Sequence, residues 1–311
     1  MNVSVKQYRK AKQRLRLVAR NWQLYLFLLP AVIVFVIFYY SPMYGVQIAF
    51  KDFRANLGIT GSPWVGLKHF ERFVTTLSFS TLMTNTLRIS LMTLVLGFPV
   101  PILFALLINE IRFTRYRKAI QTISYAPHFI STVVMVSMLT IFLDKNYGIV
   151  NKLIGVLGIG PYDFMTKGSW FAAIYVISGI WQNVGWDAIL YIAALAGVDM
   201  ELHEAAMIDG ATRLKRIIHI NIPSILPTIT IMLILACGKV MSVGFEKVFL
   251  MQNPLNTSHS EIISTFVYKA GLQSAQYSFS TAIGLFNSVI NLILLLSVNT
   301  LAKKLGETSL W

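Results

Sequence analysis

Six long apolar runs constrain what this 311-residue chain can fold into. A helix needs roughly 20 mostly apolar residues to cross about 30 Å of hydrocarbon, and such windows cover residues 24–40, 87–108, 120–143, 170–196, 223–250 and 282–301. The runs are continuous rather than alternating, which favours helices over the strands of a membrane barrel. The sequence therefore predicts an all-α membrane protein with six transmembrane helices. We expect kinks at the prolines within them, Pro30, Pro99, Pro101 and Pro127.

The basic residues are divided unevenly between the connections. Of the 27 Lys and Arg residues, 16 lie in the N-terminal tail, the connections after the second and fourth runs, and the C-terminal tail. Only nine lie in the other connections, which are longer. Because an excess of Lys and Arg marks the cytoplasmic side, we predict both termini in the cytoplasm. The expected parts are a basic tail (1–21), a six-helix transmembrane domain (22–301) with an outer loop (41–85) and a cytoplasmic loop (199–223), and a second tail (302–311).

Composition excludes several classes of function. The chain is 55% hydrophobic and only 13% charged, so its net charge of +14 is crowded into connections. That pattern fits topology and attraction to anionic membrane lipid rather than a nucleic-acid-binding face. The single cysteine, Cys237, removes any disulfide framework, and five scattered histidines offer no metal-binding spacing. We therefore expect no metal site, no catalytic residues and no cofactor bound by this chain.

The cytoplasmic loop 199–223 has a distinctive pattern. Asp199 is a suitable N-cap, Gly210 is placed to end a short helix, and Thr212 can begin a second one. The first helix would present a small apolar face flanked by acids, formed by Leu202, Glu204, Ala205, Ala206, Met207, Ile208 and Asp209. Such a helix could enter a groove of another protein or lie on lipid headgroups. Its acids would be repelled by an anionic leaflet, which favours the protein partner.

These residues carry a resemblance to a known family. Glu204-Ala205-Ala206, then Gly210, then Ile220-x-Ile222-Pro223 resembles the EAA loop of the permease subunits of binding-protein-dependent ATP-binding-cassette importers, with Ile222 in place of the usual Leu. The resemblance implies a type I importer fold in the bacterial cell membrane. It also implies a coupling helix that docks onto a cytoplasmic ATPase, formed by Glu204, Ala205, Ala206, Met207, Asp209, Gly210 and Arg213.

Shorter motifs along the chain, such as Tyr40-Ser41-Pro42-Met43-Tyr44-Gly45 and the terminal Ser309-Leu310-Trp311, resemble the carbohydrate subgroup typified by the Lpl-type permeases. This resemblance implies a second homologous permease, two ATPases that bind ATP and Mg, and an extracellular or periplasmic binding protein that delivers an oligosaccharide, neutral or acidic. The chain itself has no P-loop, so we expect no ATPase activity from it.

Polar residues inside the fourth run suggest where a substrate would pass. Gln182, Asn183, Trp186, Asp187 and Tyr191 combine amide, carboxylate and aromatic groups, which a sugar site uses, although interhelical bonds and an interfacial aromatic belt explain them equally well. Lys239 and Asp187 both lie roughly 25 Å from the cytoplasmic loop, at 1.5 Å per residue. Lys239 could therefore pair with Asp187, bind a substrate carboxylate or be purely structural.

In the last run, Asn287 suits a cavity or an interhelical contact equally, and we include it among the candidate pathway residues. Two other classes of function compete with the importer. A stand-alone secondary transporter of a polar solute would be expected to show inverted repeats or paired broken helices, which the sequence does not display. A membrane-embedded enzyme would need catalytic groups that converge near one membrane face.

Overall fold

The computed structural model describes residues 20–304, 306 and 308–310. Within these residues the regular secondary structure is helical and there is no strand, apart from one isolated bridge between Lys51 and Trp64. It divides into two compact units, Met1–Gly66 and Leu67–Trp311. Most of the predicted basic tail 1–21 lies outside the described residues.

The first unit contains one long apolar helical stretch, Trp22–Phe50. It is built from α2 (Trp22–Phe35), a π-helical turn (Val36–Tyr40), α3 (Ser41–Met43) and a 3₁₀ helix (Tyr44–Phe50). Pro30 sits inside α2 without ending it. The segment after this stretch folds back on itself, because the rings of Phe50 and Trp64 stack at 5.7 Å and the Lys51 Nζ donates a hydrogen bond to the Ile59 carbonyl at 2.7 Å.

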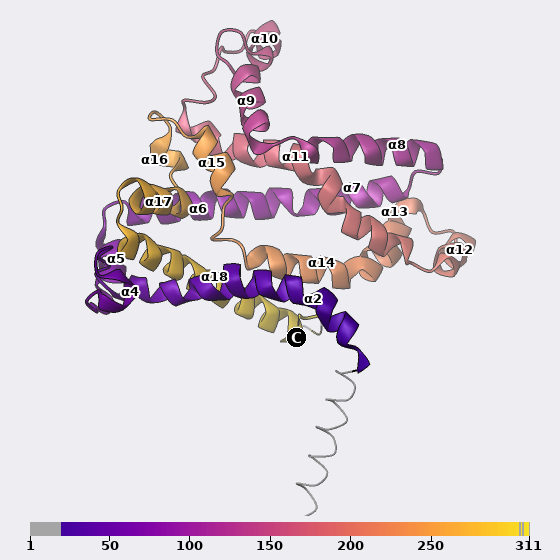
Figure 1. Cartoon of the computed structure of the whole chain (residues 1–311). Helices are drawn as coiled ribbons and strands as arrows, with labels where there is room; N and C mark the ends of the chain where they lie inside the picture. Colours follow the sequence, from indigo (N-terminus) through magenta and orange to yellow (C-terminus); the bar gives the residue numbers. More distant parts are fainter. Residues whose placement is uncertain (1–19, 305, 307, 311) are drawn as a thin grey trace, which may run out of the picture. The chain divides into compact units, whose positions relative to one another are not determined.

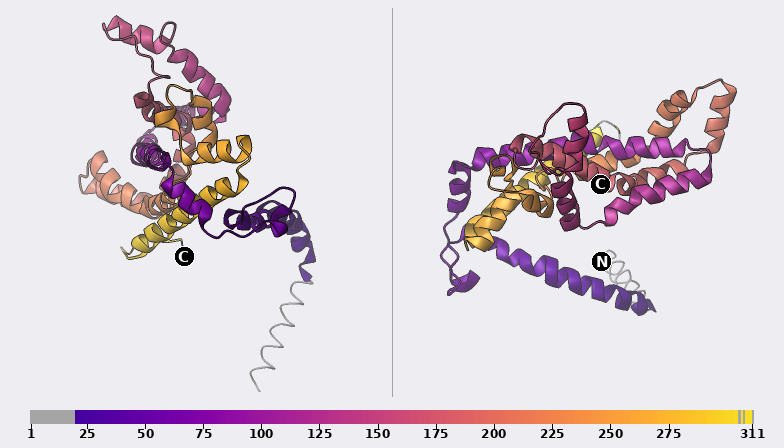
Figure 2. Two further views of the ribbon diagram at one scale, coloured as in Figure 1. Left: turned by 90° about the vertical axis from the view of Figure 1, so that its left-hand side faces the viewer. Right: turned by 90° about the horizontal axis from the view of Figure 1, so that it is seen from above.

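The first unit also contains the short α4 (Gly58–Gly61), and the second unit holds the helices from α5 onward (Figure 1). In chain order they are α5 (Lys68–Thr75), α6 (Phe79–Met92), α7 (Pro99–Asn109), α8 (Thr114–Tyr125), α9 (Thr132–Phe142), α10 (Ile149–Val156), α11 (Gly168–Ala196), α12 (Met200–Ile208), α13 (Arg213–Arg216), α14 (Ile222–Cys237), α15 (Phe245–Met251), α16 (Thr257–Ser260), α17 (Ile263–Tyr268) and α18 (Tyr277–Lys304). Helix α9 carries α10 away from the other helices of this unit (Figure 2).

Four helical stretches are long and apolar enough to cross a membrane: Trp22–Phe50, Phe79–Asn109, Arg213–Cys237 and Tyr277–Lys304. Helix α11 has 29 residues, which span about 43 Å at 1.5 Å per residue. It does not reach the same hydropathy, because Gln182, Asn183 and Asp187 interrupt its apolar surface. The sequence prediction of six spans is thus matched by four clear candidates.

Two of the predicted spans are not continuous helices. The expected helix at 120–143 is two helices, Thr114–Phe129 and Thr132–Phe142, which meet at a 96° bend near Pro127. The expected helix at 223–250 ends at Cys237 and resumes at Phe245. A kink at Pro127 was expected, and the 96° break lies near it, whereas the interruption after Cys237 was not predicted, since apolar composition does not fix the path of the backbone.

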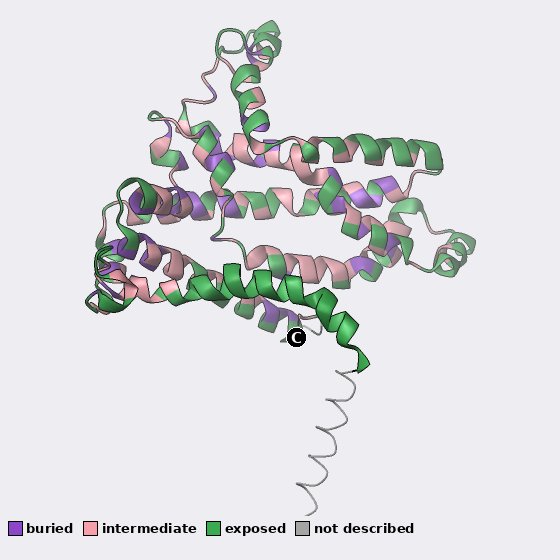
Figure 3. Ribbon diagram, in the orientation of Figure 1, coloured by how far each residue is buried: buried purple, intermediate pink, exposed green. Residues whose placement is uncertain are grey.

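Three buried clusters hold the second unit together (Figure 3). The first packs α5 and α6 against α17 and α18 around Phe73. The second joins α6, α9, α11 and α15 around Phe171 and Val248. The third joins α7, α11 and α14 around Ala188 and Ile225. Along α11, polar residues lie between the second and third clusters, and they line the cavity described next.

Candidate functional site

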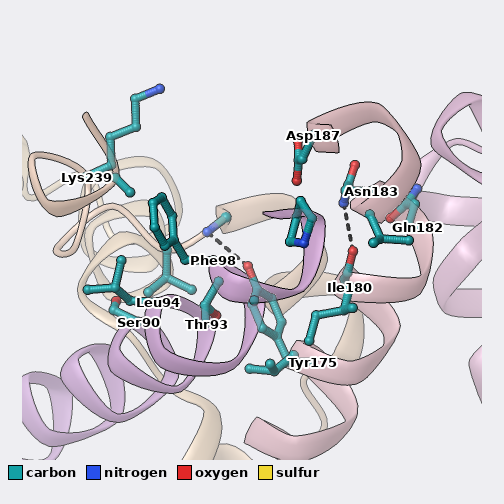
Figure 4. Close-up of a pocket in the computed structure, with 18 of the residues that line it drawn as sticks. Ser90, Thr93, Leu94, Phe98, Tyr175, Ile180, Gln182, Asn183, Asp187 and Lys239 are labelled. Carbon is teal, nitrogen blue, oxygen red and sulfur yellow. Dashed lines mark hydrogen bonds between the residues drawn. The ribbon is translucent and has the colours of Figure 1, made fainter. Parts of the chain in front are cut away.

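A cavity of about 520 Å³ opens between α6, α11 and the segment that joins α14 to α15. Its polar lining includes Gln182, Asn183 and Asp187 from α11, and Lys239 and Lys247 from the other wall. Figure 4 shows Gln182, Asn183 and Asp187 on one helix, with Lys239 at the opposite side of the view. The size falls within the range of small-molecule sites, and the mixture of apolar wall and few polar groups is typical of them.

The non-helical backbone at residues 238–244 is held by side chains from two other helices. The Met241 N–H donates to the Asn291 Oδ1 at 2.9 Å, and the Asn291 Nδ2 donates to the Ser242 Oγ at 2.8 Å. The Gly244 N–H donates to the Tyr175 hydroxyl at 3.2 Å. Irregular backbone at membrane depth is tolerated only where it is buried in protein or lines an aqueous cavity. The segment fits the second condition, because it forms one wall of the cavity.

Gln182 and Asn183 have a second role at the bend between α8 and α9. The Gln182 Nε2 donates to the Ile130 carbonyl at 2.8 Å, and the Asn183 Oδ1 lies 2.9 Å from the His128 Nδ1. The first of these bonds satisfies a backbone carbonyl at the bend, and the second ties the His128 side chain to α11. Interhelical bonding, one of the two interpretations of these residues, therefore describes part of what they do, and both still line the cavity.

Trp186 stacks on the same bend. Its ring lies 4.3 Å from that of His128 with an interplanar angle of 4°, and the Phe129 ring meets it edge-on at 5.8 Å. It is 43% exposed and is not among the residues that line the cavity. Gly185, one position earlier, has no room for a side chain, because a Cβ there would overlap the Ser124 backbone.

The structure places the other candidate residues in different surroundings. Tyr191 is buried and reaches the cavity from α11. Lys239 and Asp187 line the same cavity, yet no ion pair joins them in the described chain. Asn287 lines a second cavity of about 440 Å³ between α15, α17 and α18, where its buried Oδ1 has no hydrogen-bond partner.

Lys247 is a cavity residue that sequence reasoning missed. It was counted with the outer connection after the fifth run, although it falls inside that apolar run, which was the available signal. In the structure it is 9% exposed, in the first turn of α15. Its Nζ donates to the Tyr175 carbonyl at 2.9 Å and lies 4.7 Å from the centre of the Tyr175 ring.

The predicted coupling segment forms two short helices, α12 and α13. Asp199 caps α12, since its Oδ1 accepts from the Glu201 N–H at 3.0 Å, and Thr212 caps α13 through the Lys215 N–H at 3.4 Å. Gly210 has φ +75°, a left-handed conformation that favours glycine. The face between these ends is exposed: Leu202 is 52%, Met207 50% and Ile208 87% accessible. Glu204, Ala205, Asp209 and Arg213 are exposed as well, and Ala206 is half-buried.

Comparison with known proteins identifies the family. Residues 97–307 match the family model of the binding-protein-dependent transport system inner membrane component. This region includes α7, the coupling segment, and the helices α11, α14 and α15 that line the cavity of about 520 Å³.

Two similar proteins come from Bacillus subtilis (strain 168). The polygalacturonan/rhamnogalacturonan transport system permease protein YteP is 44% identical over 97% of this chain and 95% of its own length. Protein LplB is 44% identical over 94% of this chain and 92% of its own length. Solved structures agree with them. A chain of a bacterial ABC transporter involved in import of the acidic polysaccharide alginate superposes with a TM-score of 0.86 and 40% identity, covering 94% of this chain and 99% of that one.

A second structure of a bacterial alginate ABC transporter, in complex with a periplasmic protein that holds an alginate pentasaccharide, gives a TM-score of 0.87 and 39% identity. It covers 95% of this chain and 99% of that chain.

Proposed function

This chain belongs to the family of inner membrane components of binding-protein-dependent transport systems, and we propose that it passes an oligosaccharide cut from an acidic polysaccharide into the bacterial cytoplasm. It works as one permease subunit of an ATP-driven importer. A second permease, two ATPases and an external binding protein complete the complex. The class of substrate is supported by YteP, named for polygalacturonan and rhamnogalacturonan, and by the alginate importers. Membership of this family excludes the stand-alone secondary transporter.

The observation that carries the proposal is the cavity between α11 and the break after α14. Its lining combines amides, a carboxylate, two ammonium groups and the aromatic Tyr175 and Tyr191. Amides and carboxylates hydrogen-bond hydroxyl groups, and aromatic rings cover the apolar faces of sugars. A membrane-embedded cavity with these groups suits a polyhydroxylated solute, whereas an ion site would bring several carbonyl or carboxylate oxygens together in a tight cluster. The described residues contain no group of side chains suited to hold a metal.

The proposed arrangement in the membrane has six spans and both termini in the cytoplasm. It adds α11 and the bent pair α8–α9 to the four clear spans. The polar side chains of α11 can lie within the membrane because some of them line the cavity and others contact the bend between α8 and α9. The chain holds no nucleotide, and ATP with Mg binds to the partner ATPases, which dock on α12.

The proposed docking of the ATPases on α12 can be tested by substitutions on its exposed face. Glu204→Lys reverses a charge on the exposed coupling face, and Ile208→Asp places an acid at its most exposed apolar position. We expect both variants to lose most ATP-driven uptake of an oligouronate in vesicles that contain the full importer, and to recover less ATPase when the tagged chain is purified. Lys303→Gln, in the last turn of α18, serves as a control that leaves both measurements unchanged. Intact uptake with Glu204→Lys, together with no recovered ATPase from the unmodified chain, would contradict the proposal.

A further inference from the structure

Lys247 places a buried ammonium group on the wall of the cavity. The side chain is 9% exposed, and its Nζ is fixed by the Tyr175 carbonyl at 2.9 Å and by the Tyr175 ring at 4.7 Å. Tyr175 is itself anchored, since its hydroxyl accepts a hydrogen bond from the Gly244 N–H. On the α11 side, Gly179 leaves space beside the ammonium: a Cβ there would lie 3.4 Å from Nζ, with no other atom within 4 Å.

The charge of Lys247 is not balanced inside the described chain. An ammonium has three donors, and the structure accounts for one of them. No ion pair joins Lys247 to an acidic side chain of the described residues. The other charged residues that line the same cavity are Lys239 and Asp187, so the lining carries two cations and one anion. A buried cation without an anion is costly, and such groups in membrane proteins mark substrate pathways.

Lys269 shows how the chain treats a lysine whose role is structural. Its Nζ forms an ion pair with the Glu261 carboxylate at 2.7 Å, although the side chain is more exposed than that of Lys247. The Lys247 Nζ is instead held by the Tyr175 carbonyl and ring, and Gly179 leaves open space next to its two remaining N–H donors. A carboxylate in that space would accept the unused N–H groups in charge-assisted hydrogen bonds.

We propose that Lys247 binds a carboxylate of the transported oligosaccharide, so that this cavity selects chains that bear uronate groups. The inference rests on the proposed function and adds the group that gives it specificity. Lys239, exposed on the same lining, is placed to attract the anion, while Lys247 holds it. An acidic side chain of the partner permease could supply the same chemistry, and the experiment below distinguishes the two sources.

The test uses the complete importer in proteoliposomes and compares uptake of a uronate trisaccharide with uptake of its methyl ester. The external binding protein is the same throughout, so any change in the ratio of the two rates comes from the permease. Lys247→Met should lower the preference for the acid by about tenfold or more, since a hydrogen bond to a charged group contributes about 1.5–3 kcal/mol. Uptake of the ester should persist. Lys247→Arg should keep the preference, and so should the control Lys269→Met.

Gly179→Val changes the same site from α11 and leaves the Lys247 ammonium group in place. It should reduce the preference for the acid because it fills the space beside Nζ. If Lys247→Met does not assemble with the partner permease, the result with Gly179→Val decides: a retained preference would assign the anion to the partner and overturn the inference. An unchanged ratio in an assembled Lys247→Met importer would overturn it too, while oligosaccharide uptake left the proposed function standing. Uptake of neither sugar by the unmodified importer would contradict the proposed function and, with it, the inference.

Discussion

Gly185 allows α8 to lie directly against α11. A Cβ at this position would overlap the carbonyl group of Ser124, so the contact depends on the absence of a side chain. Small residues let the backbones of membrane helices approach closely, and packing of this kind replaces the hydrophobic effect within lipid. The position also lies between Asn183 and Trp186, both of which touch the bend after α8.

We expect Gly185→Ala to lower the stability of the chain by about 1–3 kcal/mol, the usual cost of an overpacked contact. The matched control is Gly284→Ala in α18, where a Cβ meets no atom within 4 Å. There alanine should gain about 0.5–1 kcal/mol from its better helix propensity. Thermal unfolding of the two variants in detergent measures the difference. Equal midpoints would show that α8 and α11 do not pack as described.

At this scale the sequence indicated which residues matter but not what they contact. The polar cluster from Gln182 to Asp187 stood out because such groups are costly in lipid. Its partners Ile130 and His128 lie more than 50 residues away in sequence, at a bend that the continuous apolar pattern does not reveal. Lys247 was overlooked for a similar reason, since its burial depends on how α15 returns to α11.

At the level of elements, the main departure from the sequence prediction is the break between α14 and α15. Residues 238–244 include Val240, Met241 and Val243, so an apolar window runs through them without interruption. The break is stabilised by Asn291 from α18 and Tyr175 from α11, which replace lost helical hydrogen bonds. The two caps of the coupling segment were predictable from local pattern, whereas this break depends on tertiary contacts.

Replacement of Asn291 tests the role of that contact. Asn291→Leu removes the acceptor for the Met241 N–H and the donor to the Ser242 hydroxyl. Met241 is buried, and a buried N–H left without a partner costs about 1–3 kcal/mol, so we expect a clear loss of thermal stability and of uptake. Asn287→Leu, one helical turn earlier, should cost little, because the Asn287 Oδ1 has no partner to lose. Similar losses in both variants would argue against the anchoring role of Asn291.

For the whole molecule, the orientation in the membrane rests on the distribution of basic residues. The chain has one cysteine, so a Cys237→Ser background permits single reporter cysteines. Arg115 in α8 and Lys145 between α9 and α10 are both exposed. In the proposed orientation, a membrane-impermeant maleimide should label Lys145→Cys in intact cells and Arg115→Cys only after the cells are permeabilised.

Permeabilised cells provide the control, since both cysteines should then react to a similar extent. Labelling of Arg115→Cys in intact cells, with protection of Lys145→Cys, would invert the orientation and place α12 outside the cell. The coupling proposal would fail at the same time, because its ATPase partners need ATP from the cytoplasm.

The position of α12 in the chain has a mechanical consequence. It lies in the connection that joins α11 to the helices leading into α14 (Figure 1), and both α11 and the break that follows α14 line the cavity. Helix α12 is therefore connected along the chain to both of these elements, and we expect a displacement of α12 to move both of them. Thermodynamic coupling between two binding events is reciprocal: if one event changes the affinity of the other, the second changes the affinity of the first by the same factor. If the ATPases dock on α12 as proposed, occupation of the cavity and nucleotide binding are then coupled through this helix, and each affects the free energy of the other.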